Sequence, residues 1–457
     1  MNRIAARSYI IFILVLSLVA GMAFFATEYV IESPNWVLET GSPHIYDEQG
    51  IHFQCGMVVE RDNLILLDLR DGRQYTGAEL LRKSTLHWLG DRYGNIAAPT
   101  IDYYADKIAD FDRINGLYHY GETGGVVKLT LSGKVQRAAL EALGEHKGTV
   151  AVYNYKTGEI LCAVSTPTYD PDNVPDIAGD TTGVYEGAYL NRFTQSVYTP
   201  GSIFKIVTLA AALETIEDIQ QRSFQCTGSV TIEPDSITCE HTHGVQDLKS
   251  AFSNSCNCVF AQIAMELGSE TMDRYAAAFG ITQSITFDGI TTAAGNYEAG
   301  SDAINIGWSG VGQYNDQINP CAYLTFLGAI ANGGQGVNPY IVEGISVGRD
   351  SVYKAQTQQR DRILSEETAQ VLQSYLRNNV MFRYGDYNFP GLTVCAKTGT
   401  AEVGGDQKPN AMFTGFVTDE EYPLAFIICV ENAGYGGTVC IPMASAVLEA
   451  CKDALDS

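Results

Sequence analysis

Hydrophobic and polar residues follow three different patterns along the 457 residues of this chain. The first is an uncharged, strongly apolar run at residues 8–27, preceded by Arg3 and Arg7. As a helix, this run would span about 30 Å, the thickness of the hydrocarbon layer of a membrane. The positive flank predicts that residues 1–7 form a cytoplasmic tail and that the rest of the chain lies outside the cell membrane. A cleaved signal peptide is the alternative, but apolar residues continue past a small-residue site at 21–23, which favours a single-pass anchor.

The second pattern covers residues 28–125. Short strand-like runs alternate there with turn clusters, helix signals are few, and no set of catalytic residues stands out. We predict a small mixed domain close to the membrane, a pedestal for the larger C-terminal region.

The third pattern, at residues 126–457, moves from strands to helices and back to strands. Helical spacing at 129–145 precedes two alternating runs that predict a β-hairpin around residues 156–158. Helical segments then dominate from about residue 200 to residue 380 and predict an all-helical subdomain. Three strand-like runs and a final helix come next, at 392–402, 411–417, 424–431 and 443–455. This order predicts an α+β fold with an antiparallel sheet flanked by helices.

One segment of the helical region carries the elements of an activated nucleophile. Ser202 and Lys205 lie directly after Pro200-Gly201 and before an apolar, helix-like run at 206–213. Their spacing places both side chains on one face of a helix, so the lysine amine can serve as a base for the serine hydroxyl. A turn that opens a helix also places Ser202 near the positive end of the helix dipole, where a developing oxyanion is favoured.

Two further short elements accompany this pair. Ser255-Cys256-Asn257 follows a helical run at 247–252, and Lys397-Thr398-Gly399 follows a strand-like run at 392–396. Ser-x-x-Lys, Ser-x-Asn and Lys-Thr-Gly together are the signature of penicillin-binding proteins and serine β-lactamases.

The chain also holds a second copy of each element. Residues 351–354 repeat Ser-x-x-Lys in a polar stretch, which predicts a solvated surface, and Ser33-Pro34-Asn35 lies just outside the apolar N-terminal run. Lys156-Thr157-Gly158 repeats Lys-Thr-Gly at the predicted hairpin turn, where Gly158 would supply a positive φ. Only the elements around Ser202 combine the expected order with the expected local structure.

From about residue 126 to the C-terminus, the chain resembles the transpeptidase domain of class B penicillin-binding proteins. The resemblance includes the segment after the hairpin (158–167), the run before the nucleophile (190–202) and the extension of the third element to Glu402. It is fainter in the pedestal, where residues 41–47 replace an Arg-Gly element, and Tyr314 stands where many relatives have a glycine. No glycosyltransferase element is evident, so the resemblance implies a monofunctional peptidoglycan D,D-transpeptidase.

The resemblance also implies roles for the catalytic residues. Ser202 would attack the carbonyl between the two D-alanines of a stem peptide, and neutral Lys205 would accept its proton. Ser255 would relay a proton to the leaving amine, while Asn257 would hold the substrate amide or the Lys205 ammonium. β-Lactams would acylate Ser202 in the same way.

The third element is implied to receive the substrate. Lys397 and Thr398 would meet the terminal carboxylate of the peptide, and Gly399 would let the substrate backbone lie against the strand. The backbone N–H groups of Ser202 and Thr400 would form the oxyanion hole. The family further implies a glycan polymerase of the SEDS class as partner.

Composition excludes one class of function. The chain carries 53 acidic and 29 basic residues, a formal net charge of −24. Nucleic-acid binding needs clustered lysine and arginine, so we expect no nucleic-acid partner. We also expect no cofactor.

The cysteine count is eleven, an odd number for an exported chain. Cys226 and Cys239 flank a short strand-and-turn segment and form the best candidate pair for a disulfide. Together with His241 and His243 they offer ligand types that suit zinc. Because the spacing matches no strong zinc pattern, we expect a disulfide or a plain structural role there, and no metal.

Two other functions use the same residues differently. A D,D-carboxypeptidase or β-lactamase would pass the acyl group to water instead of an amine. A non-enzymatic scaffold would regulate a membrane glycan polymerase, and such a role could coexist with catalysis.

Overall fold

The computed structural model describes residues 2–36, 55–109, 111–112, 117–118, 124–232, 234–405 and 407–456. The predicted departure from the family at residues 41–47 lies outside these described residues.

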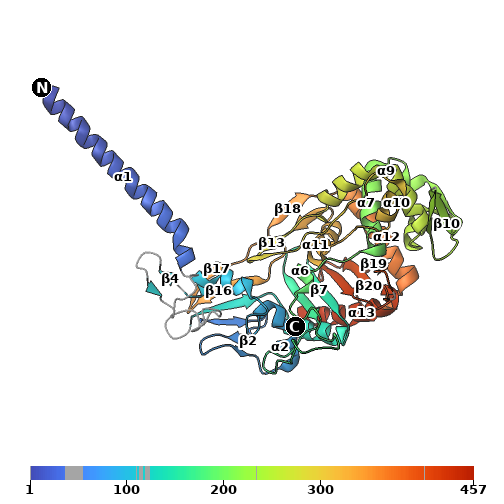
Figure 1. Ribbon diagram of the computed structural model, residues 1–457, viewed down its shortest axis with the longest axis horizontal. Coiled ribbons are helices and arrows are strands. Elements are labelled where there is room, and N and C mark those ends of the chain that lie inside the picture. The colour runs from blue at the N-terminus through green and yellow to red at the C-terminus, as the bar shows by residue number, and fades with distance from the viewer. Residues whose placement is uncertain are drawn as a thin grey trace.

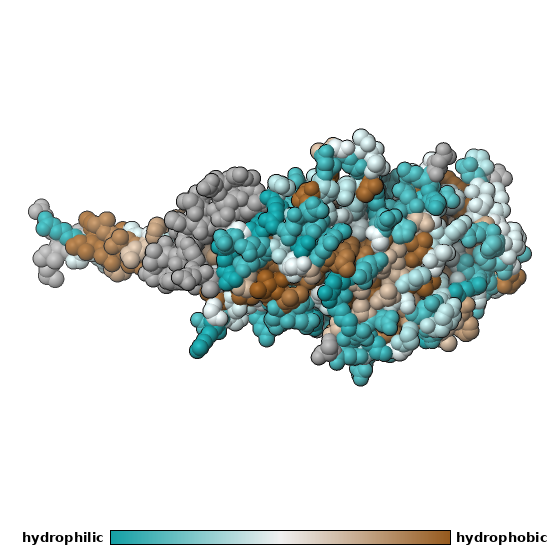
Figure 2. Space-filling view, turned by 90° about the horizontal axis from the view of Figure 1, so that it is seen from below, coloured by the Kyte–Doolittle hydropathy of each residue, from teal (hydrophilic) through white to brown (hydrophobic). Residues whose placement is uncertain are grey.

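The N-terminal apolar run forms one long helix, α1 (Asn2–Trp36). Within it, Arg7–Glu32 is long and apolar enough to cross a membrane by length and composition. The helix extends beyond the predicted 8–27 at both ends, because flanking polar residues continue the helical hydrogen bonding. Figure 1 shows α1 projecting away from the rest of the described chain, and Figure 2 shows apolar side chains gathered on it. From Arg7 to Glu32, every side chain except the partly buried Tyr29 is exposed, as expected for a segment that lipid would cover.

A six-stranded sheet lies at the end of the body nearer to α1 (Figure 1). Its strands, in spatial order, are β17 (Asp350–Lys354), β16 (Val342–Val347), β6 (Gly125–Leu129), β1 (Met57–Val59), β2 (Ile65–Asp68) and β3 (Gln74–Tyr75). Strand β6 pairs with β1 in parallel and with β16 in antiparallel fashion. The sheet therefore joins strands from both sides of residue 126, and the division of the chain into domains there stays a prediction.

The second sheet is the predicted antiparallel one, with five strands. In spatial order they are β19 (Val394–Ala401), β20 (Asn410–Val417), β21 (Leu424–Val430), β7 (Gly148–Asn154) and β8 (Ile160–Thr166). The hairpin of β7 and β8 and the three late strands are confirmed.

Both faces of this sheet are buried, and each face packs against different helices. Phe426 and Ile428 share a core with α5 (Gly133–Leu143) and α13 (Gly436–Leu455). Ile427 lies on the opposite face, in a core that includes α11 (Pro320–Ala331). The alternation follows from the two-residue period of a strand.

The helical region lies at the far end from α1 (Figure 1). Besides α11, its main helices are α7 (Lys205–Thr215), α8 (Leu248–Ser253), α9 (Asn257–Ala278), α10 (Ala303–Gly310) and α12 (Glu366–Asn379). Helix α7 is apolar nearly all round and runs through the centre, where Ile206 to Ala212 are buried. The expectation of an all-helical subdomain is wrong, because short strands pair within this region: β9 (Ser223–Cys226) with β12 (Gly244–Asp247), β10 (Ser229–Ile232) with β11 (Asp235–Thr238), and β13 (Thr286–Phe287) with β14 (Ile290–Thr291).

Candidate active site

The segment around Ser202 is a short 3-10 turn, Gly201–Ile203, that leads directly into α7. Gly201 adopts a φ of +54°, and a Cβ atom there would collide with the carbonyl oxygen of Thr400. Its N–H donates to the Gly312 carbonyl at 2.8 Å, and the Tyr323 hydroxyl donates to the Ile203 carbonyl at 2.7 Å. Glycine is therefore required by both conformation and space, and the turn is held against strand β19.

The lysine amine of the first element contacts the serine hydroxyl, as the spacing predicted. Lys205 Nζ lies 2.7 Å from Ser202 Oγ and 2.8 Å from Asn257 Oδ1. The other end of the Asn257 amide donates from Nδ2 to the Thr238 carbonyl at 2.8 Å. The amide therefore presents its oxygen to the amine, which matches one of the two roles expected for Asn257.

Ser255 bridges the two lysines of the site. Its Oγ lies 3.3 Å from Lys205 Nζ and 3.1 Å from Lys397 Nζ. Ser255 has a φ of +52°, a conformation that is uncommon for residues other than glycine and that is often found at functional sites. The three elements, far apart in sequence, thus meet in one hydrogen-bonded group.

Burial shapes the electrostatics of the two amines. Lys205 and Lys397 are both fully buried, without an adjacent carboxylate partner at hydrogen-bond distance among the described residues. Burial lowers the pKa of Lys205 to about 8. Burial also lowers the pKa of Lys397 well below its ordinary value, and the charge on Lys205 lowers it further. Both amines are thereby shifted towards the neutral form that a general base requires.

Strand β19 carries the third element as the edge strand of the five-stranded sheet. Lys397 Nζ donates to the Thr398 carbonyl at 3.0 Å as well as contacting Ser255, so the amine lies beneath the cleft floor instead of lining it. Thr398 and Thr400 do line the cleft. The terminal carboxylate of a peptide would therefore meet these hydroxyls more directly than the Lys397 amine.

Gly399 is constrained by the protein itself. A Cβ atom at Gly399 would lie 3.0 Å from both Ile203 Cγ2 and the Pro200 carbonyl oxygen. The missing side chain lets the nucleophile turn approach the strand, a different reason from the substrate contact that the sequence suggested.

The cleft above these residues has a volume of about 780 Å³. Its walls include Ser202, Ser255 and Asn257, three of the residues predicted to be catalytic, together with Trp308, Tyr314, Glu402 and Tyr435. Tyr314 has a φ of +67°, a conformation that glycine adopts most readily, and it adds an aromatic side chain to the wall.

Sequence reasoning missed Tyr384 as a member of the site. Its hydroxyl lies 3.1 Å from Thr398 Oγ1 and accepts a hydrogen bond from the Thr398 N–H at 3.1 Å. The residue belongs to a π-helical turn after α12, Val380–Tyr384, and no short motif marks it. Such turns are frequent at functional sites, which gives a structural signal but not a sequence one.

The duplicate elements are found elsewhere. Residues 351–354 lie on strand β17, and Ser351 and Lys354 are exposed, as predicted. Lys156 stands in the hairpin turn, where Gly158 has the predicted positive φ, +94°.

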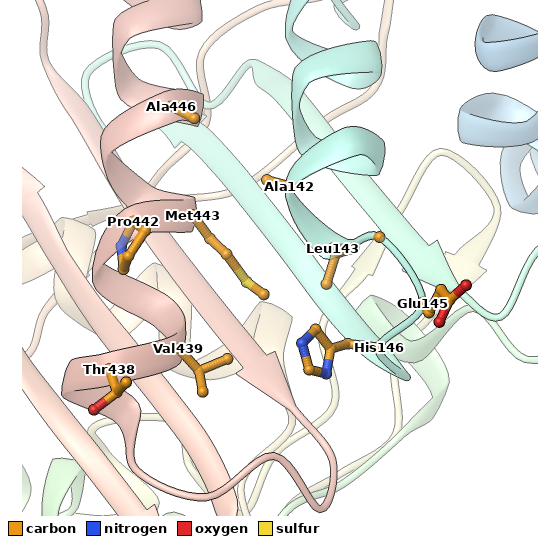
Figure 3. Close-up of a pocket in the computed structure, with 10 residues that line it drawn as sticks. Ala142, Leu143, Glu145, His146, Thr438, Val439, Pro442, Met443 and Ala446 are labelled. Atoms are coloured by element: carbon orange, nitrogen blue, oxygen red, sulfur yellow. The ribbon is translucent and has the colours of Figure 1, made fainter.

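A second hollow of about 870 Å³ lies between α5 and α13 (Figure 3). Figure 3 shows Leu143, His146, Val439 and Met443 around it. No residue predicted for the active site lines this hollow.

The predicted disulfide is wrong. All eleven cysteines are free thiols in the structure, so the predicted disulfide between Cys226 and Cys239 is not formed. The Sγ atom of Cys239 instead lies 3.6 Å from that of Cys256. His241 is exposed and lies outside the cysteine cluster that contains His243.

A serine hydroxyl paired with a buried lysine amine at the edge of a cleft defines the site of a serine acyltransferase. The sequence model of one protein family, the penicillin-binding protein transpeptidase domain, matches residues 148–449 of this chain. The chain belongs to this family.

Named relatives agree with the assignment. The chain is 29% identical over 359 residues to the peptidoglycan D,D-transpeptidase PbpA of Mycobacterium tuberculosis, covering 72% of each protein. It is 30% identical over 353 residues to the stage V sporulation protein D of Bacillus subtilis, covering 70% of this chain and 52% of that protein.

Solved structures share the fold. A D,D-transpeptidase domain from Eggerthella lenta aligns with a TM-score of 0.76 and 25% identity, covering 88% of this chain and 98% of that domain. The penicillin G acyl-enzyme of penicillin-binding protein A from M. tuberculosis aligns with a TM-score of 0.73 and 24% identity, covering 87% of this chain and 99% of that chain.

Proposed function

We propose that this protein is a membrane-anchored peptidoglycan D,D-transpeptidase that works through an acyl-enzyme on Ser202. The observation that carries the proposal is the position of the Lys205 amine, which is fully buried and hydrogen-bonded to both Ser202 Oγ and Asn257 Oδ1. The names of the relatives and the acyl-enzyme structures of penicillin-binding protein A support the same reaction class.

Acylation begins when Ser202 Oγ attacks the carbonyl carbon between the two terminal D-alanines. Neutral Lys205 accepts the hydroxyl proton across 2.7 Å as the new C–O bond forms. Asn257 Oδ1 then stabilises the ammonium through its hydrogen bond. The backbone N–H groups of Ser202 and Thr400 receive the oxyanion, supported by the close approach of Gly201 to Thr400.

The leaving group departs by a proton relay. Ser255 Oγ gives its proton to the nitrogen of the terminal D-alanine as the C–N bond breaks, and it regains a proton from the Lys205 ammonium across 3.3 Å. Lys397, 3.1 Å from Ser255 Oγ on the other side, orients the hydroxyl during this transfer. The products of this half-reaction are free D-alanine, a serine ester and neutral Lys205.

The second half-reaction forms the crosslink. An amine of a neighbouring stem peptide attacks the ester and its proton passes to Lys205. The C–O bond to Ser202 then breaks as Ser202 Oγ takes this proton from the Lys205 ammonium across 2.7 Å. A new amide joins the two peptides, and the enzyme returns to its starting state. A β-lactam carbonyl takes the place of the peptide in the first half-reaction.

Substrate binding is assigned to the third element. Thr398 and Thr400 line the cleft and offer hydroxyls to the terminal carboxylate, while the buried Lys397 provides positive charge below them. Gly399 shapes this floor by allowing the nucleophile turn to approach.

The proposal includes the orientation of the chain in the membrane and a protein partner. Arg7–Glu32 anchors the chain in the cell membrane, with the catalytic region on the outer side, where peptidoglycan is assembled. A peptidoglycan synthase complex that couples polymerization and crosslinking is among the similar structures, with a TM-score of 0.62 over 72% of this chain and 24% identity. This likeness supports a SEDS-family glycan polymerase as the partner.

A crosslinking assay with the purified full chain in detergent tests the proposal. The donor is a stem peptide that ends in D-Ala-D-Ala, the acceptor is a second stem peptide with a free amine, and both D-alanine release and crosslinked product are measured. We expect crosslinked product from the wild type and from Ser351→Ala, and none from Ser202→Ala.

The same assay separates the alternatives. D-alanine release without crosslinked product would indicate a carboxypeptidase and contradict the transpeptidase proposal. Crosslinking that survives Ser202→Ala would contradict the assignment of the nucleophile.

A further inference from the structure

Four metal-binding side chains converge beside the Ser255 element. The Sγ atoms of Cys226, Cys239 and Cys256 and a ring nitrogen of His243 all lie within 4.8 Å of one another. Two thiolates bound to one tetrahedral zinc ion at about 2.3 Å would lie about 3.8 Å apart. The distance of 3.6 Å between the sulfur atoms of Cys239 and Cys256 is close to that value.

His243 supplies an independent sign of a ligand. Its Nδ1 atom is buried and has no hydrogen-bond partner among the described residues. A buried polar atom without a partner calls for an explanation, and an ion bound at that atom is one.

We propose that Cys226, Cys239, His243 and Cys256 bind one Zn²⁺ ion in a closed, tetrahedral, structural site. Three cysteines and one histidine are a common ligand set for structural zinc. On binding, the three thiols lose their protons to solvent, so the site carries one net negative charge.

The surroundings of the sulfur atoms suit this charge. The N–H of Cys258 donates to the Cys239 Sγ atom at 3.3 Å. Cys256 is the N-cap residue of α9, Asn257–Ala278, so the thiolates lie near the positive N-terminal end of a helix that runs unbroken as far as a kink at Gly268. Hydrogen bonds from backbone N–H groups to ligating sulfur atoms are the kind of outer-shell contact that tunes metal sites.

The ligands come from separate segments beside the cleft, and two of them, Cys239 and His243, line it. Cys226 ends β9, Cys239 directly follows β11, His243 directly precedes β12, and Cys256 lies between the two catalytic residues of the second element. These strands belong to short hairpins with little core of their own, so a bound ion would fix their positions relative to α9.

Zinc would thereby hold two catalytic groups in place. Thr238, whose carbonyl accepts the Asn257 amide at 2.8 Å, is adjacent to the ligand Cys239. Ser255, with its φ of +52°, is adjacent to the ligand Cys256. This consequence for acylation rests on the proposed function, whereas metal binding itself does not.

The first test is the metal content of the full chain, purified in detergent under reducing conditions with zinc in the growth medium. We expect one zinc per chain by elemental analysis, and loss of the metal in Cys226→Ser and in His243→Gln. The matched controls are Cys321→Ser, which changes a buried thiol of α11 outside the cluster, and His241→Gln, which changes a neighbouring histidine outside it; both should keep one zinc.

Cobalt provides a readout that needs no variant. Wild-type protein stripped with a chelator and reloaded with Co²⁺ should show the visible bands of tetrahedral cobalt and a thiolate-to-cobalt charge-transfer band. Addition of Zn²⁺ should abolish both. Absence of these bands, or absence of zinc from the reduced wild type, would overturn the proposal.

Oxidation is the competing outcome. A mass decrease of two hydrogens with two of the three cluster thiols joined as a disulfide, and no zinc, would also overturn the metal site. A zinc-loaded wild type that fails to react with fluorescent penicillin would instead count against the proposed function. The measured zinc would still support the metal site.

Discussion

The two copies of Ser-x-x-Lys in this chain have the same spacing but different surroundings. At 202–205 the motif spans a 3-10 turn and the start of α7, and Lys205 is fully buried with its amine 2.7 Å from the serine hydroxyl. At 351–354 it lies on β17, the edge strand of the six-stranded sheet, where Ser351 and Lys354 are exposed. Residues three apart on a strand point to opposite faces, so this second pair cannot meet.

The two copies of Lys-Thr-Gly repeat the contrast. Lys397 is buried in β19 and contacts Ser255, whereas Lys156 is exposed in a turn and donates from Nζ to Asn332 Oδ1 at 2.7 Å. The same motif residues can therefore take part in proton transfer only where the fold brings their side chains together and burial excludes water from the lysine amine. Each exposed copy also provides a control for its buried counterpart.

Removal of the base should give the largest effect. Lys205→Met keeps the stem of the side chain but deletes the amine, and general-base catalysis contributes about 10²–10⁴-fold. We expect the acylation rate with fluorescent penicillin to fall by that factor. Lys354→Met, at the exposed copy, should keep the wild-type rate, and an equal loss in both variants would break the comparison.

The pH dependence of acylation should report the buried amine. Only neutral Lys205 accepts the Ser202 proton, and its pKa is lowered to about 8, so the rate should rise with pH and level off above that value. The charged and titratable groups near this amine are Lys397, Glu240, Cys239 and Cys256. Stopped-flow acylation measured from about pH 6 to about pH 9 checks the profile, and a flat profile would show that Lys205 does not titrate there.

Two glycines with similar φ values allow a second comparison of a buried site with an exposed one. Gly201 and Gly348 have φ values of +54° and +59°, so an alanine at either position costs about 1–2 kcal/mol from backbone strain. Only at Gly201 would the new methyl group collide with a carbonyl oxygen, that of Thr400, which adds about 1–3 kcal/mol.

Thermal denaturation of the two variants measures this difference. We expect Gly201→Ala to lower the melting temperature clearly more than Gly348→Ala, which has no atom within 4 Å of its new methyl group. Equal shifts would mean that the nucleophile turn is not held against β19.

The smallest expected effect comes from Tyr384→Phe. The change removes one hydroxyl that contacts both the N–H and the Oγ1 of Thr398, and a hydrogen bond of this kind contributes about 0.5–1.5 kcal/mol. We expect the loss, about threefold to tenfold, in KM for the donor peptide more than in kcat, because we propose that Thr398 binds the carboxylate. Tyr387→Phe, at an exposed tyrosine of the following turn, should match the wild type in both constants.

Much of the fold and the core of the site could be predicted from the sequence. Periodicity identified the hairpin, the three late strands and the central helices, because each presents a regular apolar face. The three motifs identified Ser202, Lys205, Ser255, Asn257 and Lys397, and the structure brings all five together.

The features that the sequence did not predict depend on contacts between distant segments. The six-stranded sheet pairs β1 with β6 and β6 with β16, strands that lie far apart in the chain. Tyr384 joins the site through a π-helical turn without a motif. Cys256 was assigned to the second element alone, and its proximity to Cys226, Cys239 and His243 depends on how two hairpins fold against α9.

The central claim is that burial and alignment make Ser202, and not its exposed copy, the nucleophile. Peptide mapping of the penicillin adduct by mass spectrometry tests it directly, since the adduct mass stays on the residue that was acylated. We predict that the adduct is found on the peptide that contains Ser202, at one equivalent per chain. An adduct on the peptide that contains Ser351, or on any peptide without Ser202, would contradict the account.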